Sequence, residues 1–178
     1  MHPRTIELLA YLDDQRAVLK SAFDSVPPDM RDREPSAGRW SASNVIEHLA
    51  IVERRISILL SRQIASARAA GLAPETRTDP VLPTLDVARV ADRTTRVKAP
   101  DTALPTGLDA AAAWSSLENA TESLHRMIAS GDGLELDSVS HPHPTLGLMS
   151  VYKWVAFIGA HEARHAAQIR EILLRKDD

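Results

Sequence analysis

The chain has 178 residues, enough to bury roughly 70% of the surface that its unfolded form would expose, so we expect residues 1–178 to form one domain. The formal net charge of −3 provides no positive field for nucleic acid or an anionic membrane. Because cysteine is absent, disulfides, thiolate zinc sites and a cysteine nucleophile are excluded. The N-terminal segment lacks the apolar region of a signal peptide and no run reaches membrane-spanning length, which predicts a cytoplasmic protein.

Four segments space their apolar residues by three or four positions, as amphipathic helices do. A pair of prolines, Pro27 and Pro28, ends the first segment. Ser41 precedes the second segment as an N-cap, and Gly71 follows it. Few segments show the alternation of a β-strand, so the sequence predicts an all-α fold. The predicted helices cover residues 5–26, 42–70, 109–129 and 150–175.

The connection between the second and third helices is long and contains five prolines, over residues 71–107. It is too poor in glycine and serine for a purely flexible linker, and a helical turn is expected within residues 85–92. Such a crossover lets two long helices lie parallel. We therefore expect a four-helix bundle with one long crossover. The sequence leaves the role of this crossover open.

The stretch HEARH, at residues 161–165, matches the H-E-x-x-H pattern of zinc peptidases, in which two histidines hold the metal and the glutamate activates water. The extended form of the pattern requires a glycine at the position of Gln168 and a histidine at the position of Glu171. Neither is present, and only thirteen residues follow His165, too few to bring a ligand from another helix. The sequence therefore argues against a peptidase.

Three histidines fall on apolar helix faces. His161 and His165 lie one turn apart on the fourth helix, and His48 lies within the apolar stripe of the second. Three neutral imidazoles can hold a divalent first-row metal and leave positions open for water or substrate. The alternative is an internal hydrogen-bond network without metal, since buried imidazoles need partners.

Four further residues are candidates for contacts with a substrate or with the metal ligands, and each has a plainer alternative. Asn44 lies one turn before His48 and is either a polar anchor or a first-turn capping residue. Glu162 is either an outer-shell partner of His165 or a solvated surface glutamate. Arg164 is either a cation for an anionic substrate or a surface charge, and His143, in the loop SHPHPTLG, is a rim contact or a ligand.

The sequence resembles the DinB-like superfamily, which includes the YfiT-like metal-dependent enzymes. GRWSASNVIEHLAIVERRI is similar to the family's tryptophan-serine start of the second helix, with its histidine one turn further on. HPTLGLMSVYKWVAFIGAHEARHAAQIREI is similar to the closing segment, in which the H-x-x-x-H pair is followed by a glutamine. RVKAPDTALPTG resembles the crossover before the third helix in one branch of the family. These stretches occur in the family's order.

The resemblance implies an up-down-down-up bundle, frequently a homodimer, with a divalent metal such as Zn, Ni, Mn or Fe held at His48, His161 and His165. Relatives include transferases and isomerases that use a low-molecular-weight thiol: bacillithiol, mycothiol or glutathione. We therefore expect a metal-dependent enzyme that acts on a small molecule by thiol S-transfer or hydrolysis. The alternative is a non-catalytic, stress-associated binding protein with a structural metal or none.

Overall fold

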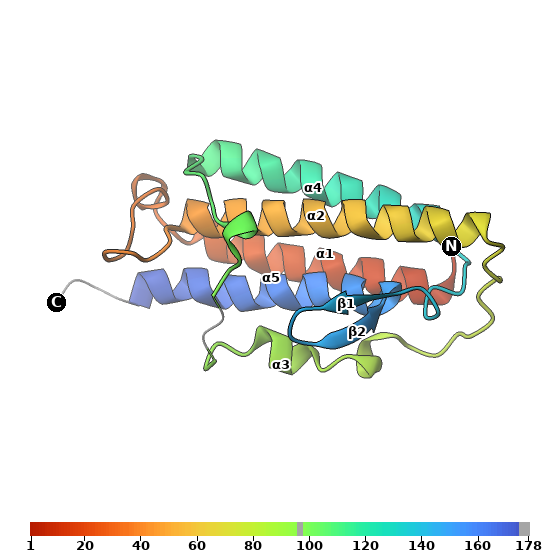
Figure 1. Ribbon diagram of the computed structural model, residues 1–178. Helices are drawn as coiled ribbons and strands as arrows, with labels where there is room; N and C mark the ends of the chain where they lie inside the picture. Colours follow the sequence, from red (N-terminus) through yellow and green to blue (C-terminus); the bar gives the residue numbers. More distant parts are fainter. Residues whose placement is uncertain (96–97, 175–178) are drawn as a thin grey trace.

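The structure, a computed structural model, describes residues 1–95 and 98–174, and its long helices form the predicted four-helix bundle (Figure 1). Helices α2 and α4 run in one direction and pack together, whereas α1 and α5 run in the other direction and pack together. This is the up-down-down-up arrangement. The four helices are α1 (Pro3–Asp24), α2 (Ala42–Ala69), α4 (Ala110–Ser130) and α5 (Val151–Leu174).

The helix ends follow local chemistry. The Ser41 side chain accepts a hydrogen bond from the backbone N–H of Asn44, and the Asn44 side chain accepts one from the backbone N–H of Ser41, so α2 begins with a capping box. Asp109 caps α4 in the same manner, through the N–H of Ala112. The first helix begins two residues before the predicted start because Pro3 suits a first turn, where no N–H is needed.

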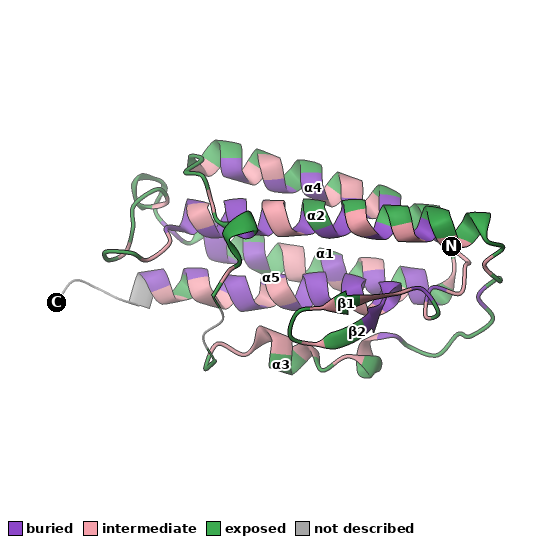
Figure 2. Cartoon of the chain, in the orientation of Figure 1, coloured by how far each residue is buried: buried purple, intermediate pink, exposed green. Residues whose placement is uncertain are grey.

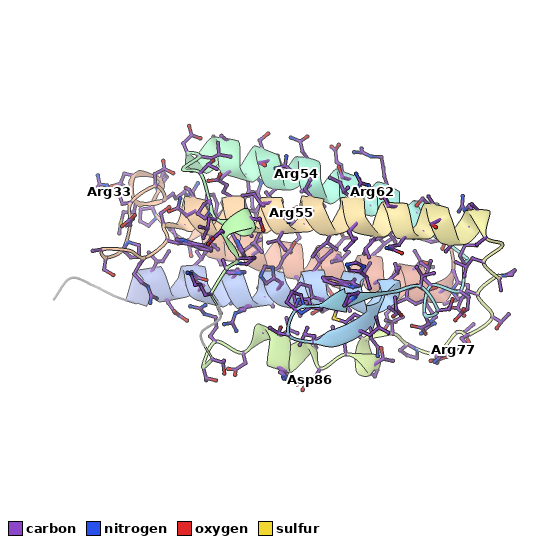
Figure 3. The ribbon with its side chains drawn as sticks, viewed as in Figure 1. Arg33, Arg54, Arg55, Arg62, Arg77 and Asp86 are labelled. Carbon is purple, nitrogen blue, oxygen red and sulfur yellow. The ribbon has the colours of Figure 1, made fainter. Side chains whose placement is uncertain are left out.

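Two apolar clusters fill the interior, one toward each end of the bundle, and the buried faces of the helices turn toward each other (Figure 2). The outer face of α2 carries Arg54, Arg55 and Arg62, which are exposed (Figure 3). Helices α1 and α5 approach closely at Gly159, where an added Cβ would lie 2.4 Å from Cε1 of Tyr11. Within the described residues, no helix has the length and apolar character to cross a bilayer.

A polar layer separates the two apolar clusters at mid-height. On α1, Arg16 lies between Leu12 of one cluster and Leu19 of the other. On α5, residues 161–165 lie between Ile158 and Ala166 in the same way. The chain therefore interrupts its core at one level, where polar groups need specific partners.

The crossover runs along α5 and carries η2 (Leu82–Thr84), α3 (Val87–Ala91) and η3 (Asp101–Ala103). Helix α3 confirms the expected helical turn. Glu47 of α2 fastens the far end of the crossover, because its carboxylate accepts hydrogen bonds from N–H groups of Thr106, Gly107 and Leu108 and from the Thr106 hydroxyl. These donors also lower the pKa of Glu47, against the effect of its burial.

A short hairpin, which helical periodicity did not predict, precedes α5. Strand β1 (Ser140–His143) pairs antiparallel with β2 (Gly147–Ser150). Proline is tolerated in such an edge strand, so Pro142 did not prevent pairing, and Pro144 lies in the turn between the strands. The hairpin matters for the site because it brings His143 against Trp154 of α5, with ring centroids 5.0 Å apart.

Candidate metal centre

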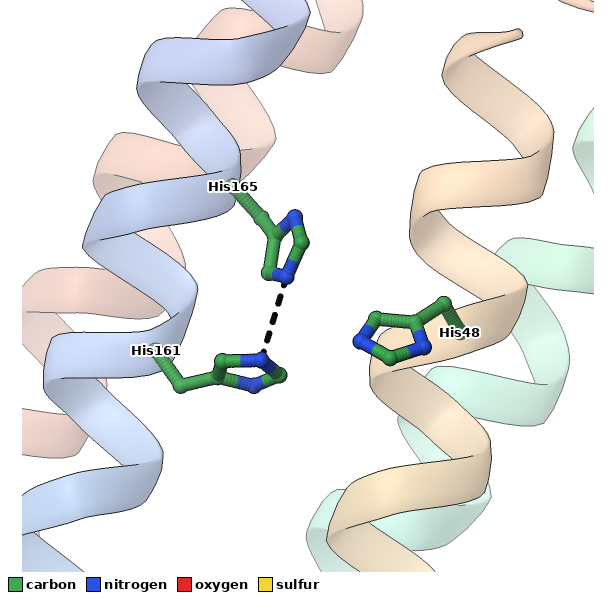
Figure 4. A group of neighbouring side chains, drawn as sticks. All are labelled: His48, His161 and His165. Atoms are coloured by element: carbon green, nitrogen blue, oxygen red, sulfur yellow. Dashed lines mark hydrogen bonds between the residues drawn. The ribbon is translucent and has the colours of Figure 1, made fainter. Parts of the chain in front are cut away.

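Three imidazoles meet where α2 faces α5, at the edge of the polar layer (Figure 4). One nitrogen from each of His48, His161 and His165 lies within 4.8 Å of the others. The Nε2 atoms of His161 and His165 are 3.1 Å apart, and the ring of His48 faces both, with centroids 5.3 and 5.0 Å away. The residues that periodicity places on inward faces therefore converge on one point.

Two of these rings have their tautomer fixed by an oxygen that can only accept a hydrogen bond. Nδ1 of His48 lies 2.7 Å from the carbonyl oxygen of Ala103 in η3. Nδ1 of His165 lies 2.9 Å from the carboxamide oxygen of Gln168. Each Nδ1 must therefore carry the proton, and in the neutral ring Nε2 keeps a lone pair. Such outer-shell acceptors commonly orient histidine ligands of metals.

The electrostatic surroundings keep the three rings neutral. Burial, together with the neighbouring imidazoles, holds the pKa of His165 well below its ordinary value. Burial and the nearby His48 and Arg164 lower the pKa of His161 to about 3. Burial also lowers the pKa of His48, against the effect of its bond to Ala103. At neutral pH the rings are thus uncharged, as metal ligands must be. With Nδ1–H on His165, its Nε2 accepts the 3.1 Å hydrogen bond and Nε2–H of His161 donates it.

This donor set fits a divalent first-row metal. Neutral imidazoles suit Zn, Ni and Fe, and three of them leave further coordination positions open. Among the described residues, the cluster of potential ligands consists of His48, His161 and His165. Three protein ligands leave a coordination position open, whereas structural zinc sites are usually closed by four protein ligands.

Aromatic rings surround the imidazoles. Trp40 packs on His48 with centroids 4.9 Å apart, and Phe157 stacks on His161 at 5.4 Å with an interplanar angle of 15°. His143, from the hairpin, lies 4.8 Å from Phe157. Its Nδ1 accepts hydrogen bonds from backbone N–H groups of residues 145 and 146, which leaves the proton of the neutral ring on Nε2. His143 stands beside the cluster and is not one of its members.

The crossover supplies much of the outer shell. Arg93 donates from Nη1 to the Gln168 carboxamide oxygen at 3.2 Å and forms an ion pair with Glu171 at 2.9 Å. Ala103 belongs to the same segment. Sequence reasoning missed these partners: the i+3 spacing of Gln168 from His165 was a usable signal, but no periodicity links the crossover residues to the histidines.

Comparison with known proteins places the chain in a family. Residues 11–169 match the sequence profile of the DinB superfamily. The chain belongs to the DinB superfamily. It is 30% identical over 143 residues to the uncharacterized protein YuaE of Bacillus subtilis (strain 168), which is 79% of this chain and 82% of YuaE. The crystal structure of TT2238, a four-helix bundle protein, covers 96% of this chain and 98% of its own at 18% identity, with a TM-score of 0.58.

The other candidates of this DinB superfamily chain lie as follows. Asn44 adopts the capping alternative described above. Arg164 is not a solvated surface charge, because it is 9% exposed and donates to the carbonyl oxygen of Thr95 at 2.6 Å. Burial lowers its pKa, although the guanidinium keeps this bond. Its place beside the crossover fixes that segment against α5.

Glu162 differs from both expectations for it. It is 1% exposed, so it is not a surface glutamate, and its carboxylate pairs with Arg16 of α1 rather than with His165. The same guanidinium lies 2.8 Å from Glu53 of α2. Burial raises the pKa of Glu162 and raises that of Glu53 to about 7, although Arg16 lowers both; the neighbouring Glu162 adds to the rise at Glu53. The spacing within HEARH carries no information about Arg16, which is 146 residues away.

Proposed function

We propose that this DinB superfamily protein is a metal-dependent enzyme that acts on a small molecule at His48, His161 and His165. The observation that carries the proposal is the convergence of three neutral imidazoles, two of which have Nδ1 engaged by an acceptor. In the absence of a metal, the 3.1 Å hydrogen bond between Nε2 of His161 and Nε2 of His165 satisfies one lone pair of the cluster. Bonds from all three rings would replace it if the site held a metal.

A divalent ion held there would supply Lewis acidity, which lowers the pKa of a water or thiol toward neutrality. The protein's own groups would orient the ligands and limit the access of water. Ala103 and Gln168 orient two of the rings, and Trp40 and Phe157 exclude water from one side. His143, whose pKa is lowered by burial, carries its proton on Nε2 and packs beside Phe157, at the edge of the cluster nearest the hairpin.

A small hollow of about 10 Å³, room for roughly one water molecule, lies next to the ligands. Trp40, which packs on His48, and Gln168, which bonds His165, both belong to it. Arg39 and Glu171 add opposite charges to its wall. We infer that a small polar molecule reaches the site from this side only if the side chains that line the hollow move apart. The full lining is Pro35, Arg39, Trp40, Gln168, Glu171 and Ile172.

Thiol S-transfer and hydrolysis are the two proposed reaction types, and S-transfer is preferred because thiol-dependent enzymes occur in the family that the sequence resembles.

The test begins with metal analysis of protein purified without an affinity tag. We expect about one ion per chain, lost in His48→Ala and kept in the control His125→Ala, since His125 lies on α4 outside the cluster. The metal-loaded protein is then assayed with low-molecular-weight thiols and electrophiles, and separately with small esters and amides.

The second candidate is a non-catalytic binding protein in which a metal only joins α2 to α5. The burial of His48 and His165, at 4% and 6% exposed, favours this alternative over a fully open site. Replacing the bound metal with Co²⁺ distinguishes the enzyme from the non-catalytic protein. A catalytic site should admit an added ligand such as a thiol or azide to bound Co²⁺ and change its visible spectrum, whereas a closed structural site should leave the spectrum unchanged.

A further inference from the structure

The carboxamide of Gln168 lies between two hydrogen-bond donors. Nδ1 of His165 approaches its oxygen at 2.9 Å, and Nη1 of Arg93 approaches the same oxygen at 3.2 Å. Gln168 lies one turn after His165 on α5, while Arg93 comes from the crossover, just beyond α3 (Val87–Ala91). An oxygen with two lone pairs can accept both bonds.

The direction of this carboxamide determines which nitrogen of His165 can bind a metal. With its oxygen toward the ring, Gln168 accepts the Nδ1 proton and Nε2 keeps its lone pair. With its amino group toward the ring, Gln168 can only donate, so Nδ1 must accept and the proton of the neutral ring moves to Nε2. That second form blocks the nitrogen that faces His161 at 3.1 Å.

Glutamine alone has no strong preference between these two directions, but arginine does. A guanidinium has five N–H donors and no acceptor, so it faces the carboxamide oxygen and is repelled by the amino group. Arg93 is itself held by both oxygens of Glu171, at 3.1 and 2.9 Å from its Nε and Nη2. Its Nη1 is therefore fixed in direction toward Gln168.

We propose that Arg93 is a positioning residue for the metal centre, which selects the metal-binding tautomer of His165 by fixing the carboxamide of Gln168. The inference rests on the proposed metal site and assigns a role to the crossover. The crossover then orients two of the three ligands: His165 through Arg93 and His48 through the carbonyl of Ala103.

The tautomer can be measured in the metal-free protein, which separates this inference from metal binding and from activity. Long-range ¹H–¹⁵N NMR of the histidine rings distinguishes Nδ1–H from Nε2–H. We expect His165 to be Nδ1–H in the parent and to become a mixture in Arg93→Met. The matched control is Arg89→Met, which removes an exposed arginine from the same segment and should leave His165 unchanged.

His48 serves as an internal control for the position of the crossover. Its tautomer depends on Ala103, so a general detachment of the segment would alter His48 as well as His165. If Arg93→Met changes both rings, or neither, Arg93 does not act through Gln168 and the proposal is overturned. A change confined to His165 supports it.

A second variant tests the route through Gln168. A carboxylate has two acceptor oxygens and no donor, so Gln168→Glu accepts a hydrogen bond from Nδ1–H of His165 in either orientation. In the double variant Arg93→Met/Gln168→Glu, the Nδ1–H form of His165 should return without Arg93. Failure of this rescue, with His48 unchanged and the fold intact by circular dichroism, would contradict the proposed route.

Metal affinity gives an independent readout by competition between the protein and a chelator for Zn²⁺. Loss of an outer-shell partner typically weakens binding roughly 10–100-fold, and we expect this of Arg93→Met, with recovery in the double variant. If the parent binds no metal, the proposed function fails while the tautomer result stands. If the parent binds metal and Arg93→Met binds it equally well, the inference fails while the proposed function stands.

Discussion

The Glu162 carboxylate lies 2.5 Å from the Arg16 guanidinium, which joins α5 to α1 in the polar layer of the bundle. Arg16 also pairs with Glu53 of α2 at 2.8 Å, so one guanidinium ties three helices together. A zinc peptidase needs its glutamate free to accept a proton from water at the metal. In this chain that carboxylate is engaged by an arginine, which gives the H-E-x-x-H pattern a structural explanation.

The first prediction contrasts the two residues at the start of HEARH. His161→Ala removes one of three nitrogen ligands and should weaken metal binding by more than the roughly 10–100-fold typical of an outer-shell change. Glu162→Gln keeps nearly the same shape and one acceptor oxygen for Arg16, so it should retain the metal while lowering thermal stability. Isothermal titration with Zn²⁺ and a thermal melt measure both effects. Loss of metal from Glu162→Gln with an unchanged melting temperature would show that Glu162 serves the site directly.

The second prediction concerns the buried charges themselves. Arg16→Met leaves two buried carboxylates, Glu53 and Glu162, without their cation and should cost about 3–5 kcal/mol of unfolding free energy. The control is Arg126→Met, which removes the cation of an exposed pair on α4 and should change stability little. Urea denaturation measures both. Equal effects of the two substitutions would mean that solvent, rather than Arg16, compensates the carboxylates.

The third prediction is that metal removal lowers stability without unfolding the chain. Two apolar clusters hold the bundle from both sides of the polar layer, so the helices do not depend on the ion. Chelated protein should keep its helical circular-dichroism signal at 25 °C and melt earlier, because a ligand at 100 times its Kd stabilises the native state by about 2.7 kcal/mol. Collapse of the helical signal on chelation would instead make the site structural.

The sequence predicted those parts of the molecule that depend on periodicity and local chemistry. Inward spacing placed His48, His161 and His165 on facing helices, and Ser41 marked the start of α2. It could not predict partners that meet only when the chain folds, such as Arg16 for Glu162. The homodimer and the cytoplasmic location stay predictions.

The crossover shows the same limit. Its scarcity of glycine and serine argued against a purely flexible linker and its short helix was expected, but its contacts arise from backbone groups and single side chains. The carbonyl of Ala103 and the guanidinium of Arg93 bear on the site because of where the segment lies against α2 and α5. No pattern of residue types predicts which backbone carbonyl will accept a hydrogen bond from a histidine. The outer shell is therefore the part of the site that required a structure.

The fourth prediction is that the metal-free protein loses stability in acid through its histidines. Burial holds the pKa of His161 at about 3, below its ordinary 6.5. Between these pH values, His161 is therefore protonated in the unfolded chain and neutral in the folded chain. Above about pH 6.5 this histidine does not lower the unfolding free energy. Below that pH the unfolding free energy falls by about 1.4 kcal/mol per pH unit for one proton. His48 and His165, whose pKa values are also lowered, act with the same sign.

Glu53 acts with the opposite sign, so the histidine effect must be measured as a difference. Its pKa is raised from 4.5 to about 7, and protonation of the folded form therefore adds stability as pH falls through that range. Comparing the metal-free parent with His161→Gln cancels this contribution, because Glu53 is present in both. From pH 6.5 downward, urea denaturation should show the parent losing its advantage over His161→Gln by about 1.4 kcal/mol per pH unit. Parallel pH profiles would mean that the folded protein protonates His161 as readily as the unfolded chain, and that the site does not keep this ring neutral.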